Sequence, residues 1–174
     1  MPETAEQYIQ RILGNIEGQD AIKVQKSTAG KLKQLIRGLT PKQLKWKSEP
    51  GKWSIAEIVA HLADSEIVGS WRLRQIVGAS GTTIQPYDQE VWASAFQYSK
   101  RDAKQSVEVF RVLRENNLDM LKALPRESWE HFGMHQERCK ETVAHVVRMF
   151  AGHDANHVKQ IEGIKAQLKK KKRK

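Results

Sequence analysis

The stretch from Val143 to Leu168 constrains the fold of this chain most strongly, because its apolar residues recur at helical spacing for about seven turns. Positions four apart on a helix lie on the same face. A stripe of this length is stable only when other helices cover it. The stripe consists of Val143, Val146, Val147, Phe150, His153, His157, Ile161, Ile164 and Leu168.

Three further segments show the same period. The first, from Thr4 to about Leu39, is predicted to be a helix interrupted by glycines and ended by Thr40-Pro41. The second begins at Ser54, whose hydroxyl forms a capping box with Glu57, and continues to about Val77. The third covers Lys100 to Leu124, where Pro125 stops it. With no convincing alternating strand, the chain is predicted to be an all-α four-helix bundle.

The connections between these helices are predicted to be irregular. Gly78 to Pro86 is expected to be a loop, and Tyr87 to Trp92 either a short helical turn or an irregular crossover. Trp129 to Lys140, which contains His131 and His135, is expected to be an irregular or extended connection. The whole of residues 1–168 is predicted to form one domain, followed by a basic tail over residues 169–174.

Composition limits the cellular setting. No apolar run approaches the length of a membrane span, and the first residues are polar and acidic, unlike a signal peptide. The single cysteine, Cys139, excludes an internal disulfide framework. These features predict a protein of the reducing cytoplasm that does not associate with membranes.

The net charge of +10 is typical of a nucleic-acid-binding protein until the charges are located. All six residues from Lys169 to Lys174 are basic, and a terminal run of lysines is usually a solvated tail. The sequence has neither a helix-turn-helix pattern nor interleaved aromatic and basic residues. Nucleic acid is therefore not an expected partner.

Two histidines, His153 and His157, fall on the apolar stripe with the spacing at which helical imidazoles can bind one metal ion. The pair alone is weak evidence, because His131 and His135 have the same spacing in a segment without helical character. A single inward histidine is more often a core residue than a ligand. A third histidine, His61, lies close to the inward face of the helix that begins at Ser54.

Three blocks of the sequence resemble the DinB/YfiT-like superfamily. They are Trp53-Ser-Ile-x-Glu-Ile-Val-x-His61-Leu-Ala-Asp64-x-Glu66, then Tyr87-Asp-x-x-x-Trp92, then His153-x-x-x-His157-x-x-Gln160-Ile161. The similarity extends from about Leu39 to Leu168. It implies a four-helix bundle that is commonly dimeric and holds a divalent ion, for which nickel, zinc and iron have been proposed.

Carried over residue by residue, the resemblance implies that His61, His153 and His157 are the metal ligands. Some relatives are thiol S-transferases that use bacillithiol, mycothiol or glutathione, and at least one is a maleylpyruvate isomerase. The sequence departs from the family at Asn156, where many relatives have another histidine. This departure leaves the three implied ligands intact.

Three neutral imidazoles from two facing helices would leave one side of an ion open for water or substrate. An ion held in this way can lower the pKa of a water or a thiol. Asp64, one turn beyond His61, is a candidate base or a group that orients an imidazole, although a solvated carboxylate is about as common there.

Two functions remain open at this level. The first is a metal-dependent enzyme acting on a small molecule, either a thiol S-transferase that uses a low-molecular-weight thiol or a related hydrolase or isomerase. The alternative is a non-catalytic, metal-holding dimeric bundle that serves as an interaction or stress-response module.

Overall fold

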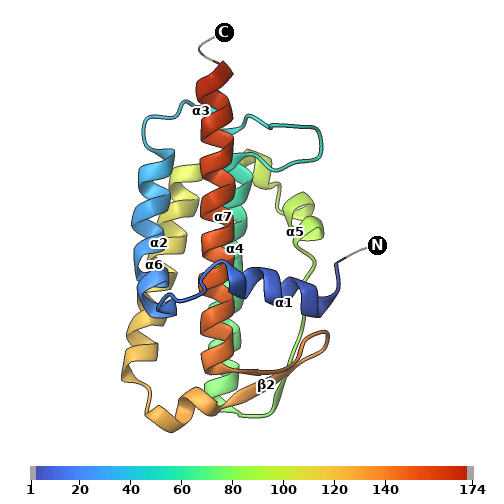
Figure 1. Ribbon diagram of the computed structural model, residues 1–174, viewed down its shortest axis with the longest axis vertical. Coiled ribbons are helices and arrows are strands. Elements are labelled where there is room, and N and C mark those ends of the chain that lie inside the picture. The colour runs from blue at the N-terminus through green and yellow to red at the C-terminus, as the bar shows by residue number, and fades with distance from the viewer. Residues whose placement is uncertain (1–2, 172–174) are drawn as a thin grey trace.

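Four long helices aligned with one another make up the body of the protein in the computed structural model, which describes residues 3–171 (Figure 1). They are α2 (Ala21–Ile36), α4 (Ile55–Gly78), α6 (Ala103–Ala123) and α7 (Val143–Lys171). The predicted all-α four-helix bundle is therefore confirmed. Within the described residues, no helix is long and apolar enough to cross a membrane.

The start of α4 is fixed by the predicted capping box. The Ser54 hydroxyl accepts a hydrogen bond from the Glu57 amide at 3.3 Å, and the Glu57 carboxylate accepts one from the Ser54 amide at 2.8 Å. Both bonds satisfy amides that the first turn of a helix leaves without partners. The side chains of Asp20 and Asp102 cap α2 and α6 in the simpler one-sided way.

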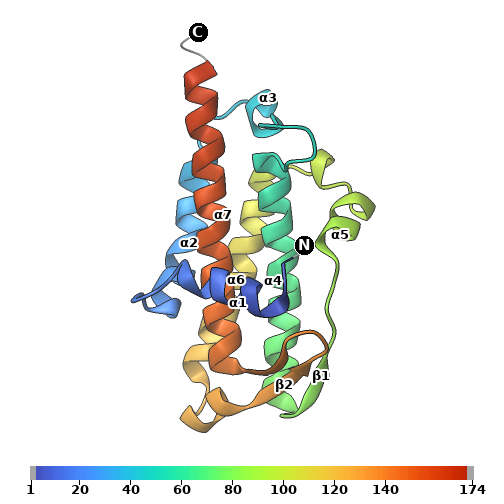
Figure 2. The same cartoon turned by 45° about the vertical axis from the view of Figure 1, so that its right-hand side comes forward.

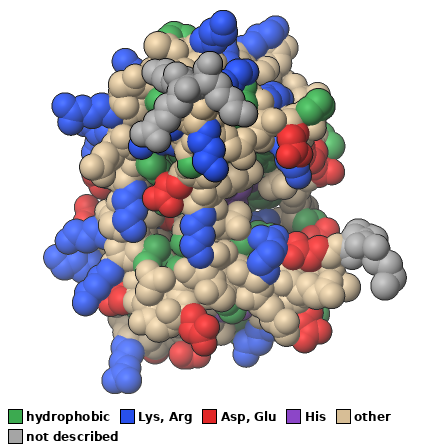
Figure 3. Space-filling model, turned by 45° about the horizontal axis from the view of Figure 1, so that its top comes forward, with side chains coloured by type: hydrophobic (Ala, Val, Ile, Leu, Met, Phe, Trp, Pro, Cys, Tyr) green, Lys and Arg blue, Asp and Glu red, His purple; other side chains and the backbone are tan. Residues whose placement is uncertain are grey.

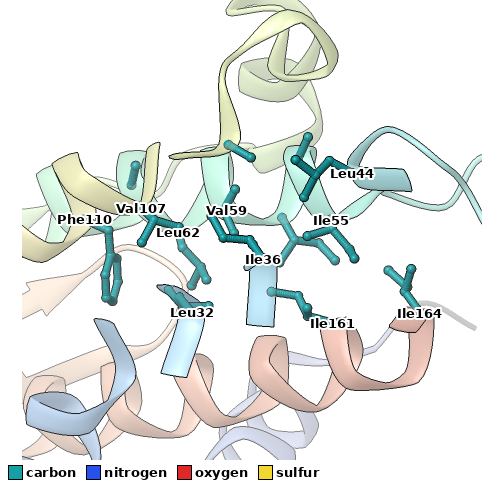
Figure 4. Close-up of a cluster of buried hydrophobic side chains, with 14 of the residues drawn as sticks. Leu32, Ile36, Leu44, Ile55, Val59, Leu62, Val107, Phe110, Ile161 and Ile164 are labelled. Atoms are coloured by element: carbon teal, nitrogen blue, oxygen red, sulfur yellow. The ribbon is translucent and has the colours of Figure 1, made fainter. Parts of the chain in front are cut away.

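The core lies between these helices and contains side chains from all four (Figure 4). In the close-up, aliphatic side chains of α2, α4 and α7 point toward one another, and Val107 and Phe110 of α6 close the cluster from the side. The labelled members are Leu32, Ile36, Leu44, Ile55, Val59, Leu62, Val107, Phe110, Ile161 and Ile164. This packing provides a rigid frame for the inward-facing residues of α4 and α7.

The N-terminal segment departs from the single interrupted helix predicted for residues 4–39. It forms two separate helices, α1 (Ala5–Gly14) and α2, and α1 crosses the middle of α7 outside the bundle (Figures 1 and 2). The chain reverses around Gly18, whose φ of +69° favours glycine. Gly30 does not interrupt α2.

A small three-stranded sheet covers one end of the bundle, where the sequence predicted a loop and an irregular or extended connection but no sheet. Strand β1 (Thr82–Ile84) pairs in parallel with β2 (Phe132–His135), which pairs antiparallel with β3 (Cys139–Thr142). A Cβ on Gly133 would lie 2.3 Å from Ile84 Cδ1, so the pairing requires glycine at this position. Strands this short give no detectable alternation in sequence.

Short elements complete the connections. The predicted helical turn near Trp92 is confirmed as α5 (Gln89–Ala95), and the remaining elements are α3 (Pro41–Leu44) and the 3₁₀ turns η1 (Tyr98–Lys100) and η2 (Arg126–Glu130). The first half of the predicted basic tail continues α7 as far as Lys171, and residues 172–174 lie outside the described part.

Candidate metal centre

Three imidazoles converge at the middle of the bundle, between α4 and α7. The Nε2 atom of His153 lies 3.0 Å from Nε2 of His61 and 3.1 Å from Nε2 of His157. One ligand atom from each ring lies within 4.8 Å of the other two. The structure therefore brings together the three residues that the resemblance implied, across 92 positions of sequence.

Each histidine is positioned by a regular part of its helix. His61 lies in the most deeply buried stretch of α4, where almost no side-chain surface reaches solvent. His153 and His157 are one turn apart on α7, with ring centroids 4.5 Å apart. Since both helices are held by the core, the three rings are fixed before any ligand arrives.

The spacing of the nitrogens suits a single ion. Two ligands bonded at about 2.0–2.1 Å with a tetrahedral angle lie about 3.3 Å apart, close to the 3.0 and 3.1 Å found here. Among residues 3–171, no fourth histidine, cysteine, aspartate or glutamate joins the group. Three protein ligands and an open position are the arrangement of catalytic rather than structural zinc sites.

Burial keeps the imidazoles in the neutral form that binds metals. Desolvation, reinforced by His157, lowers the pKa of His61 to about 3. Desolvation also lowers the pKa of His157 to about 4 and that of His153 well below its ordinary value. All three rings are therefore uncharged at neutral pH, and no proton needs to leave when an ion binds.

Neighbouring side chains orient two of the rings. Nδ1 of His157 lies 2.9 Å from the Gln160 amide oxygen, which accepts its hydrogen bond and directs the Nε2 lone pair into the cluster. The His61 ring packs at 4.9 Å from the Trp53 ring, and its buried Nδ1 has no hydrogen-bond partner. Gln160, which belongs to the same motif as His153 and His157, thus orients the His157 ring.

Two hydroxyl groups adjoin the cluster. The Ser65 hydroxyl lies 3.3 Å from His61 Nε2 and 2.7 Å from the Tyr87 hydroxyl, which reaches it from the segment between β1 and α5. Sequence reasoning did not identify Ser65. The available signal was its position four residues after His61, which places both on one face of α4.

A cavity of about 540 Å³ opens on the His153 side of the cluster. Its wall includes Ser65, Arg72 and Tyr87 from one side and Tyr8 from α1. This volume is within the range of pockets that bind small molecules, about 300–1,000 Å³. A molecule in the cavity would meet His153 and the two hydroxyls together.

The structure places the remaining candidates away from the three nitrogens. Asp64 is buried and forms an ion pair with Arg101, with 2.6 Å between Oδ1 and Nη1. Asn156, where the family pattern has histidine, accepts a 3.4 Å hydrogen bond from Arg11. His131 and His135 lie at the sheet, where His131 Nδ1 is 3.2 Å from the Val77 carbonyl oxygen. The proposed role of Asp64 as a base stays a prediction.

A buried charge network directly behind the cluster was not found from the sequence. Arg114 of α6 donates two hydrogen bonds to the Glu66 carboxylate of α4, from Nε at 3.0 Å and from Nη2 at 2.7 Å. Its Nη1 also pairs with Asp154 of α7. Asn117 donates a further bond to Glu66 at 2.7 Å. Since Asp154 follows His153, the network helps to fix the turn of α7 that carries the cluster.

Comparisons with known proteins agree with this arrangement. The family model of the DinB superfamily matches residues 26–161. YfiT of Bacillus subtilis, named a "putative metal-dependent hydrolase", is 24% identical over 149 residues, covering 84% of this chain and 83% of its own. A protein of Bacillus cereus with the same description is 26% identical over 137 residues, which is 79% of each chain.

The solved structure of YfiT superposes on this chain with a TM-score of 0.80 and 21% sequence identity, covering 95% of this chain and 89% of that one. It is described as a probable metal-dependent hydrolase with an unusual four-helix bundle topology. The family match extends over most of the chain, and the fold agrees with it. The chain belongs to the DinB superfamily.

Proposed function

We propose that this protein is a divalent-metal-dependent enzyme whose ion is bound by His61, His153 and His157. The observation that carries the proposal is the convergence of three neutral imidazole nitrogens beside an open cavity. A divalent ion in this position supplies a Lewis acid that lowers the pKa of a water or thiol at its open side.

The chain's own groups supply the rest of the site. The imidazoles hold the ion without adding charge, so its positive charge remains available to an anionic nucleophile. The hydroxyls of Ser65 and Tyr87 are each able to donate to or accept from a reacting oxygen or sulfur. The cavity would bind the substrate next to these hydroxyls.

We propose one of two reactions, hydrolysis of the substrate by water or transfer of a thiol to it. The names of the relatives favour hydrolysis, in which water is the nucleophile. A low-molecular-weight thiol such as bacillithiol, mycothiol or glutathione occupies the same position in the second reaction. The two are distinguished by whether a thiol is consumed when an activated ester or a bimane electrophile is turned over. The exposed, unpaired Cys139 suits the reducing cytoplasm in which such thiols occur.

The proposal is tested first by metal content. Protein purified without an affinity tag, stripped and then dialysed against Ni²⁺, Zn²⁺ or anaerobic Fe²⁺ is expected to retain one ion per chain. His153→Ala and His157→Ala should lose tight binding, whereas His131→Ala should keep it, since His131 lies at the sheet. Equal metal content in His153→Ala and the wild type would contradict the proposal.

Activity separates an enzyme from a metal-holding interaction module. A purely structural site is usually closed by a fourth protein ligand, and within the described chain none is present here. Turnover that disappears on chelation and returns with the ion would identify an enzyme. Full metal occupancy without turnover of esters or thiols would favour the module instead.

The family resemblance also leads us to propose a homodimer. Large apolar side chains are exposed on the outer face of α4, where Ile67 is 49% and Trp71 63% accessible. Both line one shallow groove together with Trp92. Exposed apolar surface of this kind is typical of contact surfaces. Sedimentation as a monomer at micromolar concentration would exclude the dimer, and Trp71→Glu is expected to weaken it.

A further inference from the structure

Within the part of the chain that the structure describes, Arg72 is the one buried arginine that has no carboxylate partner. It lies on α4 with 6% of its surface exposed and donates one hydrogen bond, from Nη2 to the Gln85 carbonyl oxygen at 2.7 Å. Its guanidinium carbon lies 5.9 Å from the centre of the Tyr87 ring. It forms part of the wall of the cavity beside the histidine cluster.

Within residues 3–171, no carboxylate pairs directly with this charge. Among residues 3–171, no aspartate or glutamate oxygen lies within 4.0 Å of the Arg72 guanidinium nitrogens. Arg114 is buried to a similar degree and binds two carboxylates, Glu66 and Asp154. Because arginine is rarely buried without a partner, the partner of Arg72 is expected to come from outside the chain.

The other charges around the cavity are largely matched. Glu3 is held by Arg11 through two bonds of 2.7 and 2.8 Å, and Arg138 is held by Glu141 at 2.7 Å. Glu137, which is exposed, is the remaining carboxylate in the wall. Burial and the nearby Arg138 lower the pKa of Arg72 and Glu141 opposes them in part, so an anion that entered beside the guanidinium would further stabilise its charge.

The position of Arg72 relative to the three histidines indicates the size of the substrate. Arg72 follows His61 by eleven residues on α4, which is three turns along nearly the same face, with Ser65 between them. Long helical side chains lean toward the N-terminus, so the guanidinium leans back toward His61. One substrate can therefore span the two groups, with its ends separated by on the order of 10 Å.

We propose that Arg72 binds a carboxylate of the substrate, which makes the substrate a small molecule with a carboxylate at one end and the reacting group at the other. The inference rests on the proposed function for the place of the reacting group. A single guanidinium with an unused fork of donors matches one planar carboxylate. A phosphate dianion would leave one charge unmatched.

The first test uses the metal-free, full-length chain. Benzoate is expected to bind the wild type at least tenfold more tightly than benzamide, measured by calorimetry or ligand-observed NMR, because each bond to the charged group is stronger. Arg72→Gln should remove the preference and Arg72→Lys should reduce it, whereas Arg111→Gln, which removes an exposed arginine on α6, should keep it. Equal binding of benzoate and benzamide by the wild type would overturn the proposal, as would tighter binding of phenyl phosphate than of benzoate.

The second test uses metal-loaded protein and alkyl hydroxamates, which bind an ion at one end. A hydroxamate whose other end is a carboxylate is expected to bind at least tenfold more tightly than one that ends in an amide. This difference is expected only where Arg72 is present. A gain that persists in Arg72→Gln would overturn the proposal. If no ion is retained, the proposed function fails, and the benzoate result still decides the role of Arg72.

Discussion

The Arg72 side chain combines two properties that oppose each other in a folded protein, burial and an unmatched charge. Removing a guanidinium from water costs free energy that a carboxylate partner normally offsets. Here no carboxylate within 4.0 Å provides that offset, so Arg72 is expected to stabilise the folded protein less than an apolar side chain of similar size would. Such local destabilisation is common where a side chain is reserved for a ligand.

Arg72→Met is therefore expected to raise the free energy of unfolding by about 1 kcal/mol, which for a chain of this size raises Tm by roughly 2–4 °C. The methionine keeps the apolar stem and removes the buried charge, at the loss of one bond to the Gln85 carbonyl. Thermal melts of the two metal-free proteins measure the change. Arg111→Met is the control and should change Tm little, because Arg111 forms only exposed helix pairs. A clear fall in Tm for Arg72→Met would show that the charge is compensated.

At the scale of whole elements, the contact of α1 with α7 determines where α1 forms one wall of the cavity beside His153. A Cβ on Gly152 would lie 2.2 Å from the Ile12 carbonyl oxygen, so the two backbones touch at this point. Gly152 precedes His153 on α7, and Tyr8 of α1 lines the cavity. The position of α1 is therefore linked directly to the turn that carries the cluster.

Gly152→Ala is expected to displace α1 and to lower the free energy of unfolding by about 1–3 kcal/mol, the usual effect of overpacking. Gly163→Ala in the same helix provides a matched control, because nothing lies within 4 Å of its Cβ position. There alanine should stabilise the protein by about 0.5–1 kcal/mol through better helix propensity. Denaturant unfolding of the two variants gives both values. An unchanged stability for Gly152→Ala would mean that α1 is loosely attached.

Helices with a clear apolar period were predictable from the sequence, and so were the histidines placed on their stripes. Ser54 with Glu57 located the start of α4, because a capping box is a local pattern. The three-stranded sheet was missed because strands of three or four residues, one of which contains Gly133, show no alternation of apolar and polar residues. The direction of α1 was missed because nothing near Gly18 specifies which face of the bundle the helix meets.

The charged residues of the interior were the other group that sequence could not place. An arginine or glutamate in an amphipathic helix is ordinarily assigned to solvent, and Glu66, Arg72 and Arg114 are all buried. The burial of Glu66 and Arg114 depends on partners from different helices, which only the tertiary structure brings together, and Arg72 is buried without a carboxylate partner. Asp64 was noticed for its spacing from His61, but its partner, Arg101, follows it by 37 residues.

At the scale of the whole molecule, Arg114 connects all four bundle helices. It lies on α6, binds Glu66 of α4 and Asp154 of α7, and donates to the Gln25 carbonyl of α2 at 3.3 Å. Two buried carboxylates depend on this one cation. The lysines and arginines of the surface, by contrast, are spread over the visible face rather than gathered in one patch (Figure 3).

Arg114→Met is expected to destabilise the protein by about 3–5 kcal/mol, because two buried carboxylates lose their common partner. Arg72→Met and Arg114→Met both remove a buried arginine, yet the first is expected to raise the free energy of unfolding and the second to lower it. The two variants can therefore be compared directly. Urea unfolding at neutral pH measures both. The destabilisation caused by Arg114→Met should shrink at acid pH, where the carboxylates take up protons. Similar effects of the two substitutions would contradict this account of the network.

Acid should weaken the metal-free protein through its buried histidines. The folded-state pKa of His61 is about 3, and those of His135 and His157 are about 4, whereas unfolded histidine has a pKa of about 6.5. Between these values the unfolded chain binds protons that the folded chain does not. The free energy of unfolding therefore falls as the pH decreases from about 6.5 toward 4.

Denaturant unfolding at pH 7 and at pH 5, in the presence of a chelator, measures this loss. His135→Gln removes one of the groups and should lose less stability over the interval than the wild type. Stability that is constant between pH 7 and pH 5 would show that the rings are protonated in the folded protein as well.

The division of the three imidazoles between α4 and α7 also has a consequence for biosynthesis. His61 is synthesised 92 residues before His153, so at about 5–20 residues per second the first ligand waits several seconds for the others. During that interval the partial chain offers only one of the three imidazoles of this site, too few to hold a divalent ion there. An ion bound by all three imidazoles would consequently be acquired by a chain whose last bundle helix has already been made. If the proposed function holds, metal supply should limit the activity of the finished protein more than its yield.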